Sequence, residues 1–370
     1  MVQPPSTTSK SKLRVGWVDA SKGICIFAVV TLYAANHTRE TFSDAGWMQY
    51  WVDFAKPFRM PDFFLISGLF LRRVLDRSWI QYLDKKVVHY AYFFFLWTLI
   101  NFAILRLLGE LQNDGTSVTR QLFWVLTWYP FHMLWFIQML PAYFVFAKVT
   151  HFIPKWVMLA IACILQTVWA LELGPLPTSR KVIDLFWVYY IYFYLGSIGY
   201  SYFFLFAQWV REHKALAVIG LVMWGIVNTS LVHIRIADLS MFVAFSELLG
   251  EKGVVTLADL PGVNILLGLV GATGIITLAA LIDDLDMFQW VRYLGRHSIV
   301  VYLAFYWPMV FGANLLESLR LLEGLYGIFA VLLTLTGLAG SVGLYWMTEV
   351  LGYGRWLFHR PSWLSIYRSQ

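Results

Sequence analysis

Long apolar segments recur along this chain, and they constrain its fold more than any other feature. About 20 mostly apolar residues are needed to cross the hydrocarbon core of a bilayer, and we predict about ten such segments. We expect them at 20–38, 57–75, 87–108, 131–149, 155–173, 182–206, 214–233, 262–282, 297–317 and 325–350. Only 14% of the residues are charged, against about 25% in soluble domains. The sequence therefore predicts an all-α, polytopic membrane protein.

The distribution of basic residues predicts how this bundle is oriented. With the N-terminus inside, the inner segments hold 18 of the 28 Lys and Arg residues and 8 of the 22 acids, so the inner side carries +10 and the outer side −4. Because cytoplasmic loops are enriched in Lys and Arg, we expect both termini to be cytoplasmic. Three regions follow: a disordered cytoplasmic tail at 1–16, a transmembrane domain at 17–352 and a cytoplasmic C-terminal tail at 353–370.

The composition also excludes several classes of function. The net charge is +6, but the bases lie between apolar segments and form no single block, so we expect membrane lipid as a partner and no nucleic acid. The two cysteines, Cys25 and Cys163, lie inside apolar runs, which argues against a disulfide framework. We find no Walker-type motif, no His-Glu-x-x-His and no cysteine cluster. The sequence predicts no metal site and no bound cofactor.

Polar residues mark both ends of the first apolar segment. Lys22 precedes the run from Gly23 to Ala35, and Tyr33 and His37 stand at its far end. At about 100° per residue, Lys22 and Tyr33 differ by about 20° around a helix axis, and Tyr33 and His37 are neighbours one turn apart. One helix face therefore carries a cation at one end and a phenol and an imidazole at the other.

Five stretches resemble a known family in the order in which they occur. They are WVDASKGICIFAVV (17–30), RMPDFFLISGLF (59–70), YLDKKVVH (82–89), MLWFIQMLPAYF (133–144) and YLGRHSIVVYLAF (293–305). Together they resemble the membrane acyltransferase-3 family. The resemblance implies a multi-pass enzyme of the bacterial inner (cytoplasmic) membrane that takes an acyl group, usually acetyl, from cytoplasmic acyl-CoA as co-substrate. It implies transfer to a hydroxyl group of a carbohydrate or lipid-linked glycan.

The resemblance also implies catalytic residues on the first segment. The family signature there is an Arg, ten residues and a His, and Lys22 and Tyr33 occupy these two positions. Lys keeps the charge of Arg but loses its planar fork. A Tyr, with a free pKa of about 10 against about 6.5 for His, is a weaker general base near neutral pH. We therefore expect His37, one turn further along, to be the catalytic base, with Tyr33 assisting it and Lys22 binding the substrate.

A second family signature is an Arg-x-x-Arg pair at the start of the third segment. Lys86 and His89 occupy these positions, and Arg72 and Arg73 add charge upstream. We predict that these residues bind the phosphates of acyl-CoA. The alternative is that they anchor the inner loop to anionic lipid.

Two further alternatives remain open at the level of sequence. Asp62 follows Arg59 by three residues in the second segment, and because an isolated acid is costly in a membrane we expect the two to form a structural pair. The departures at Lys22 and Tyr33 also fit a non-catalytic relative that binds or transports a lipid or an acylated metabolite.

Overall fold

The computed structural model describes residues 15–111, 117–171, 181–239, 254–319 and 324–367. Within these ranges the chain forms helices and no strand, apart from one isolated bridge between Arg235 and Thr256. The predicted all-α fold is confirmed. The tail predicted to be disordered falls almost wholly on residues 1–14, which lie outside the described ranges.

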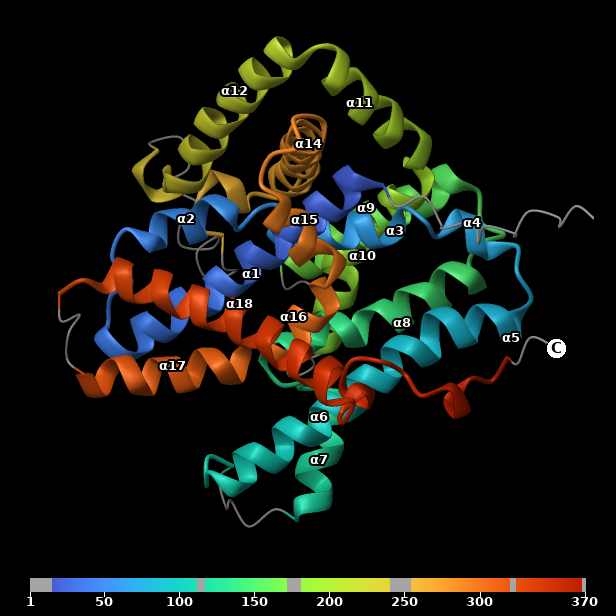
Figure 1. Ribbon diagram of the computed structural model, residues 1–370. Coiled ribbons are helices and arrows are strands. Elements are labelled where there is room, and N and C mark those ends of the chain that lie inside the picture. The colour runs from blue at the N-terminus through green and yellow to red at the C-terminus, as the bar shows by residue number, and fades with distance from the viewer. Residues whose placement is uncertain (1–14, 112–116, 172–180, 240–253, 320–323, 368–370) are drawn as a thin grey trace, which may run out of the picture.

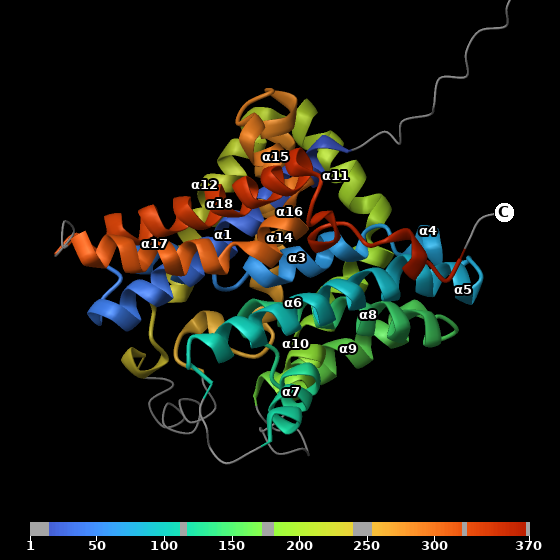
Figure 2. The ribbon, with the colours of Figure 1, turned by 60° about the horizontal axis from the view of Figure 1, so that its bottom comes forward.

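Helix α1 (Gly16–Phe42) runs through the middle of the molecule. Its apolar run favours a helix, and Asp19 in the first turn complements the positive end of the helix dipole. The helix ends at Ser43, which has a left-handed conformation (φ 63°) and donates its N–H to the carbonyl of Arg39. Figures 1 and 2 show α1 surrounded by other helices. It contacts four of them: α3 (Arg59–Gly68), α14 (Val263–Asp284), α15 (Gln289–Arg296) and α18 (Tyr326–Leu351). We call its two ends the Lys22 end and the His37 end.

Five helical segments are long and apolar enough to cross a membrane. They are α1, the segment Trp79–Leu107, α12 (Lys214–His233), α14 (Val263–Asp284) and α18 (Tyr326–Leu351). The segment Trp79–Leu107 combines α5 (Trp79–Tyr82), a π-helix at Leu83–Val88 and α6 (His89–Leu107). If each of two bent helix pairs is one span, the count rises to seven.

The other apolar segments form shorter or bent helices. The bent pairs are α10 (Lys181–Ile198) with α11 (Tyr200–Glu212) and α16 (Ser298–Ala304) with α17 (Tyr306–Leu319), and the shorter helices include α8 (Trp135–Val149) and α9 (Lys155–Ala170). The remaining α-helices are α2 (Met48–Ala55), α4 (Arg72–Leu75), α7 (Val118–Thr127) and α15 (Gln289–Arg296). Nine of the ten expected apolar segments coincide with one of these helices or pairs. The expected segment 57–75 is instead divided between α3 and α4, and neither is long enough to cross a membrane. The number of membrane crossings stays a prediction.

Two segments that were expected to be single helices are bent. The chain turns by 51° between α16 and α17, and Pro308 explains the turn because a proline cannot donate to the carbonyl four residues earlier, here that of Ala304. It turns by 73° between α10 and α11, where Gly196 and Gly199 frame the bend. Glycine weakens a helix at such a position.

Glycines let α1 and α15 approach closely. A Cβ atom on Gly23 would lie 2.0 Å from the carbonyl oxygen of Val291, and one on Gly295 would lie 1.7 Å from that of Asp19. The backbones of α1 and α15 therefore touch beside Lys22. Small residues have this role in many membrane helix pairs.

Ion pairs join segments of the bundle that are far apart in the sequence. At the Lys22 end, Arg211 and Arg292 both form ion pairs with Asp283 (2.7 and 3.1 Å). Toward the His37 end, Lys56 forms an ion pair with Asp259 (2.8 Å). In Figure 1, α4, α5 and the C-terminal segment lie on the right, and α17 meets α18 on the left.

The C-terminal segment folds back onto α6. The carbonyls of Trp356 and Leu357 accept hydrogen bonds from the Tyr92 hydroxyl (2.7 Å) and the Trp97 indole N–H (3.0 Å). Arg360 then reaches the buried Asp84 with a 3.1 Å ion pair. The residues from 353 to 367, predicted to form a tail, therefore lie against the bundle.

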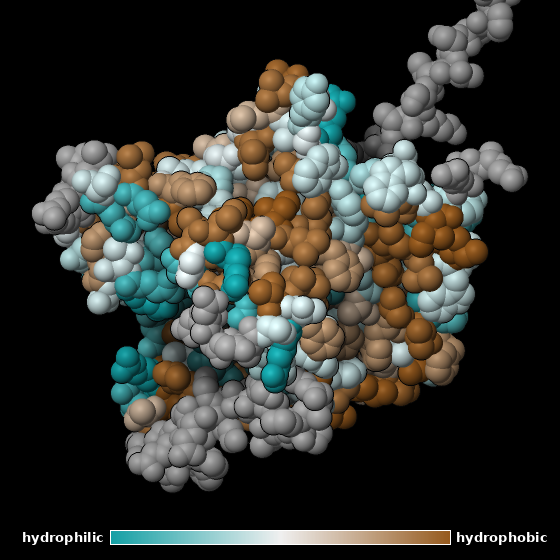
Figure 3. Space-filling model, turned by 90° about the horizontal axis from the view of Figure 1, so that it is seen from below, coloured by the Kyte–Doolittle hydropathy of each residue, from teal (hydrophilic) through white to brown (hydrophobic). Residues whose placement is uncertain are grey.

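Large apolar side chains cover much of the outer surface. On α12 the exposed residues include Leu216, Ile219, Val222, Met223 and Ile226. Brown, hydrophobic side chains also cover much of the face shown in Figure 3. Soluble proteins rarely expose apolar patches of this extent, so the surface fits a protein embedded in lipid.

Candidate functional site

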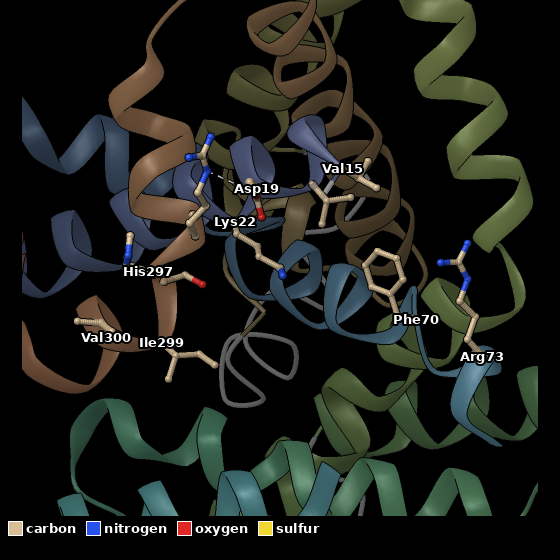
Figure 4. A pocket seen from close by; sticks show the side chains of 12 residues that line it. Val15, Asp19, Lys22, Phe70, Arg73, His297, Ile299 and Val300 are labelled. Carbon is tan, nitrogen blue, oxygen red and sulfur yellow. Dashed lines mark ion pairs between the residues drawn. The ribbon is translucent and has the colours of Figure 1, made fainter. Parts of the chain in front are cut away.

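A cavity of about 350 Å³ lies at the Lys22 end of α1. Three parts of the chain form its wall: the start of α1, the connection between α3 and α4, and the junction between α15 and α16. Its lining residues are Val15, Val18, Asp19, Lys22, Phe70, Arg73, Gly295, Arg296, His297, Ser298, Ile299 and Val300. We call this cavity the Lys22 pocket. Figure 4 shows the Lys22 side chain extending between His297 on one side and Phe70 on the other.

The Lys22 pocket is rich in positive charge. Lys22, Arg73 and Arg296 line it, against one acid, Asp19, whose Oδ2 lies 3.7 Å from Nε of Arg296. Arg73 is held in place by the ring of Tyr200, whose centroid lies 4.8 Å from its guanidinium carbon, and by a hydrogen bond to the Tyr200 hydroxyl. The pocket is therefore suited to a ligand that carries phosphate groups.

The predicted substrate-binding residues are only partly brought together. Lys22 and Arg73 line the pocket, whereas the exposed Arg72 does not. Lys86 lies close enough to Lys22 for an electrostatic interaction, and its ammonium group sits 4.7 Å from the centroid of the Phe144 ring. His89 contacts the edge of the Phe93 ring.

Lys86 also lies on the π-helix Leu83–Val88. Such π-helical turns are rare and frequently occur at functional sites. The position of Lys86 is thus set by a local distortion of the helix, which places a cation beside the pocket but outside its lining.

Two lining residues were not chosen from the sequence. Arg296 and His297 belong to the resembling stretch 293–305, but their position at the start of a span equally fits contact with lipid headgroups. The signal that could have identified them is Gly295. Its close contact with the Asp19 backbone brings the next two residues next to Lys22.

Tyr33 lies away from the Lys22 pocket, in the interior of the bundle. Its ring centroid is 5.4 Å from that of Phe305, at the bend between α16 and α17. Arg59 and Tyr306 are close enough to interact with it electrostatically. Eleven residues separate it from Lys22, which is about 16 Å along a helix.

His37 lies one turn beyond Tyr33 and faces an acid. Its Nε2 is 3.9 Å from Oε1 of Glu317 on α17, and the side chains keep 25% and 35% of their exposure. The Thr41 hydroxyl donates a 3.3 Å hydrogen bond to the same oxygen of Glu317. An imidazole next to a carboxylate is a common arrangement for a general base. Glu317 was not predicted, because it is distant in sequence and its own segment gives no sign of the contact.

The predicted pairing of Arg59 with Asp62 is wrong. The thiol of Cys25 donates to Oδ2 of the fully buried Asp62, and Oδ1 has no hydrogen-bond partner. The pairing fails because Asp62 faces α1 while Arg59 interacts with Tyr33, Tyr189 and Asp53. Within the described ranges no group of three or more His, Cys, Asp or Glu residues could hold a metal ion.

Comparison with known proteins identifies the family. No curated protein and no solved structure matched the chain. The acyltransferase domain family, acyltransferase-3, matched residues 15–346, which is nearly the whole chain and includes the Lys22 pocket, Tyr33 and His37. The matched range and the apolar helices agree, and the chain belongs to the acyltransferase-3 family of membrane proteins.

Proposed function

We propose that this membrane acyltransferase takes its acyl group from acyl-CoA bound in the Lys22 pocket. The observation that carries the proposal is the pocket itself, whose wall includes Lys22, Arg73 and Arg296 from three parts of the chain. Arg binds phosphate through a planar fork and Lys as a point charge. The phosphates of CoA would occupy this charged end, while Lys86 adds positive potential nearby.

The thioester then has to reach the far part of α1. Lys22 and His37 are fifteen residues apart, about 22 Å along a helix, so the flexible arm of CoA would extend along α1 toward Tyr33. His37 takes the proton of an acceptor hydroxyl, and the acceptor oxygen attacks the thioester carbonyl. The C–O bond forms, the C–S bond breaks and CoA leaves as a thiolate that is then protonated. Glu317, 3.9 Å from His37, stabilises the imidazolium formed in this step.

The orientation follows from the same assignment. Because acyl-CoA is cytoplasmic, the Lys22 end would face the cytoplasm and the His37 end the outer side. About ten crossings of a bacterial inner membrane would then leave both termini in the cytoplasm. The acyl group, which we expect to be acetyl, would pass to a hydroxyl of a carbohydrate or lipid-linked glycan of the cell envelope.

Acyl transfer in membranes tests this proposal. Inverted vesicles receive labelled acetyl-CoA, and the label in the glycan and lipid pools is followed for the wild type, His37→Ala and the control His233→Ala, whose exposed imidazole stacks on Tyr50. We expect His37→Ala to lower the rate by about 10²–10⁴-fold and His233→Ala to leave it unchanged. No transfer by the wild type would favour the non-catalytic alternative. Equal rates for the wild type and His37→Ala would show that His37 is not the catalytic base.

A further inference from the structure

Arg59 is a buried cation that forms no ion pair with any carboxylate of the described residues. The residue keeps 7% of its exposure, and its Nε and Nη1 atoms make no hydrogen bond. None of the ion pairs among the described residues includes Arg59, and Asp62 accepts a hydrogen bond from Cys25. A buried charge is strongly unfavourable unless a partner neutralises it. A buried arginine that forms no ion pair therefore points to a function and not only to a structural role.

The groups around Arg59 are two phenols and one carboxylate that lies beyond ion-pair distance. Tyr33, Tyr189 and Asp53 interact with it electrostatically. Asp53 accepts a 2.8 Å hydrogen bond from the side chain of Gln49 and forms no ion pair with Arg59. Arg59 is also the first residue of α3, whose N-terminus has no side-chain cap. The positive end of that helix dipole adds to the charge of the guanidinium group.

The hydrophobic core does not completely bury the two neighbouring phenol groups. Tyr33 and Tyr189 both lie against the main hydrophobic cluster, yet each keeps some accessible surface. The Tyr189 ring stacks on Phe64 and tilts against Trp135, with centroids 5.4 and 5.5 Å away. The surroundings of Arg59 therefore combine a cation, two hydroxyl groups and accessible aromatic surface.

We propose that Arg59, with the phenols of Tyr33 and Tyr189, binds a carboxylate that one of the two substrates brings into the bundle. The guanidinium fork matches the two oxygens of a carboxylate. A single cation neutralises one carboxylate, whereas the doubly charged phosphates belong to the Lys22 pocket with its several cations. This inference rests on the proposed function, since it assumes that the reaction occurs near Tyr33.

The carboxylate can come from either substrate. In the donor case, the acyl group is that of a dicarboxylic acid, with one carboxyl group as the thioester and the other on Arg59. In the acceptor case, the carboxylate belongs to an acidic sugar, and its hydroxyl group is the one that is acylated. The two cases share the same site and differ in the molecule that carries the charge.

Ligand binding to the purified full-length protein in detergent distinguishes these cases. Thermal unfolding is titrated with acetyl-CoA, succinyl-CoA, glucose and glucuronate, for the wild type, Arg59→Gln, Arg59→Lys and the control Arg235→Gln, which removes an exposed arginine from the loop that follows α12. In the donor case succinyl-CoA binds the wild type about 10–100-fold more tightly than acetyl-CoA. In the acceptor case glucuronate binds by the same factor more tightly than glucose. Either preference should vanish in Arg59→Gln, weaken in Arg59→Lys and persist in Arg235→Gln.

The experiment also distinguishes failure of the carboxylate site from failure of the proposed function. If the wild type binds both CoA esters equally and both sugars equally, the carboxylate site is wrong while the proposed function stands. A preference that survives in Arg59→Gln would equally overturn the role of Arg59. If neither CoA ester binds, the proposed function fails, and the comparison of glucuronate with glucose in the wild type still decides on the carboxylate site. These wild-type comparisons do not depend on whether the Arg59 variants fold.

Discussion

Two adjacent arginines show how local geometry assigns function at the scale of single residues. Arg72 and Arg73 have the same chemistry and were both predicted to bind acyl-CoA. Only Arg73 lines the Lys22 pocket, where Tyr200 holds it through its ring and its hydroxyl. The sequence could not separate them because the direction of each side chain depends on the short helix α4 (Arg72–Leu75).

The pair provides a matched test of the pocket. Arg73→Ala should weaken binding of acetyl-CoA about 10–100-fold, because a charge-assisted hydrogen bond to phosphate is worth about 1.5–3 kcal/mol. Arg72→Ala should change it less than twofold, since an exposed charge outside the pocket is screened. Isothermal titration of the purified variants measures both. Equal losses in the two variants would mean that general basicity of the loop, and not the pocket, binds the ligand.

A second residue pair, Lys56 and Asp259, should control how the stability of the protein responds to acid. Burial opposes ionisation of Asp259, but the ammonium group of Lys56 and the hydrogen bonds from Thr256 outweigh it and hold the pKa of Asp259 below its ordinary value of 3.8. A lowered pKa stabilises the folded state above pH 3.8, and this stabilisation is lost as the pH falls through the folded-state value.

The free energy of unfolding of Asp259→Asn should therefore depend less on pH in the acid range than that of the wild type. We expect the variant to lose about 0.5–1 kcal/mol at pH 7, as for a pair with one exposed partner, and to approach the wild type as the pH falls from about 5 to 3. Thermal unfolding across this range measures the difference. A constant gap between the two proteins at every pH would show that Asp259 acts by packing and not by charge.

At the scale of elements, glycines set the distance between α3 and α10. A Cβ atom on Gly68 would lie 2.0 Å from the carbonyl oxygen of Phe193, and one on Gly196 would lie 2.0 Å from that of Leu65. The two backbones are in contact, and α3 carries Arg59 at its start and leads to Arg73 at its end. The spacing of this helix pair thus fixes the depth of both arginines.

Substitution of these glycines should destabilise the protein. Gly68→Ala and Gly196→Ala should each cost about 1–3 kcal/mol, because the helices have to separate to admit a methyl group. Gly343→Ala is the control: a methyl group on this exposed residue of α18 would have no atom of a neighbouring segment within 4 Å, and alanine favours a helix by up to about 1 kcal/mol. Unfolding temperatures in detergent compare the three. Unchanged stability in all three variants would contradict close packing of α3 on α10.

At the scale of the whole molecule, hydropathy predicted the positions of the helices because membrane insertion depends mainly on length and composition. The bends were harder to predict. Pro308 and the pair Gly196 and Gly199 were visible, but a proline or glycine in a membrane helix does not always produce a bend, because neighbouring helices can compensate for it.

The sequence predicted only part of the candidate site. Lys22, Tyr33 and His37 were assigned to one helix because a helical repeat fixes their relative directions. The contacts with Arg296, Arg59 and Glu317 join segments far apart in the chain. Such contacts depend on how the helices pack, and no local pattern in the sequence specifies them.

The most direct measurement is a cryo-EM map of the full-length protein with a non-hydrolysable acetyl-CoA analogue. The account predicts that the phosphates of the analogue lie within hydrogen-bond distance of Lys22 and Arg73, and that its acyl end extends along α1 to the neighbourhood of Tyr33. Density for the analogue outside the Lys22 pocket, or an acyl end that leaves α1, would contradict it.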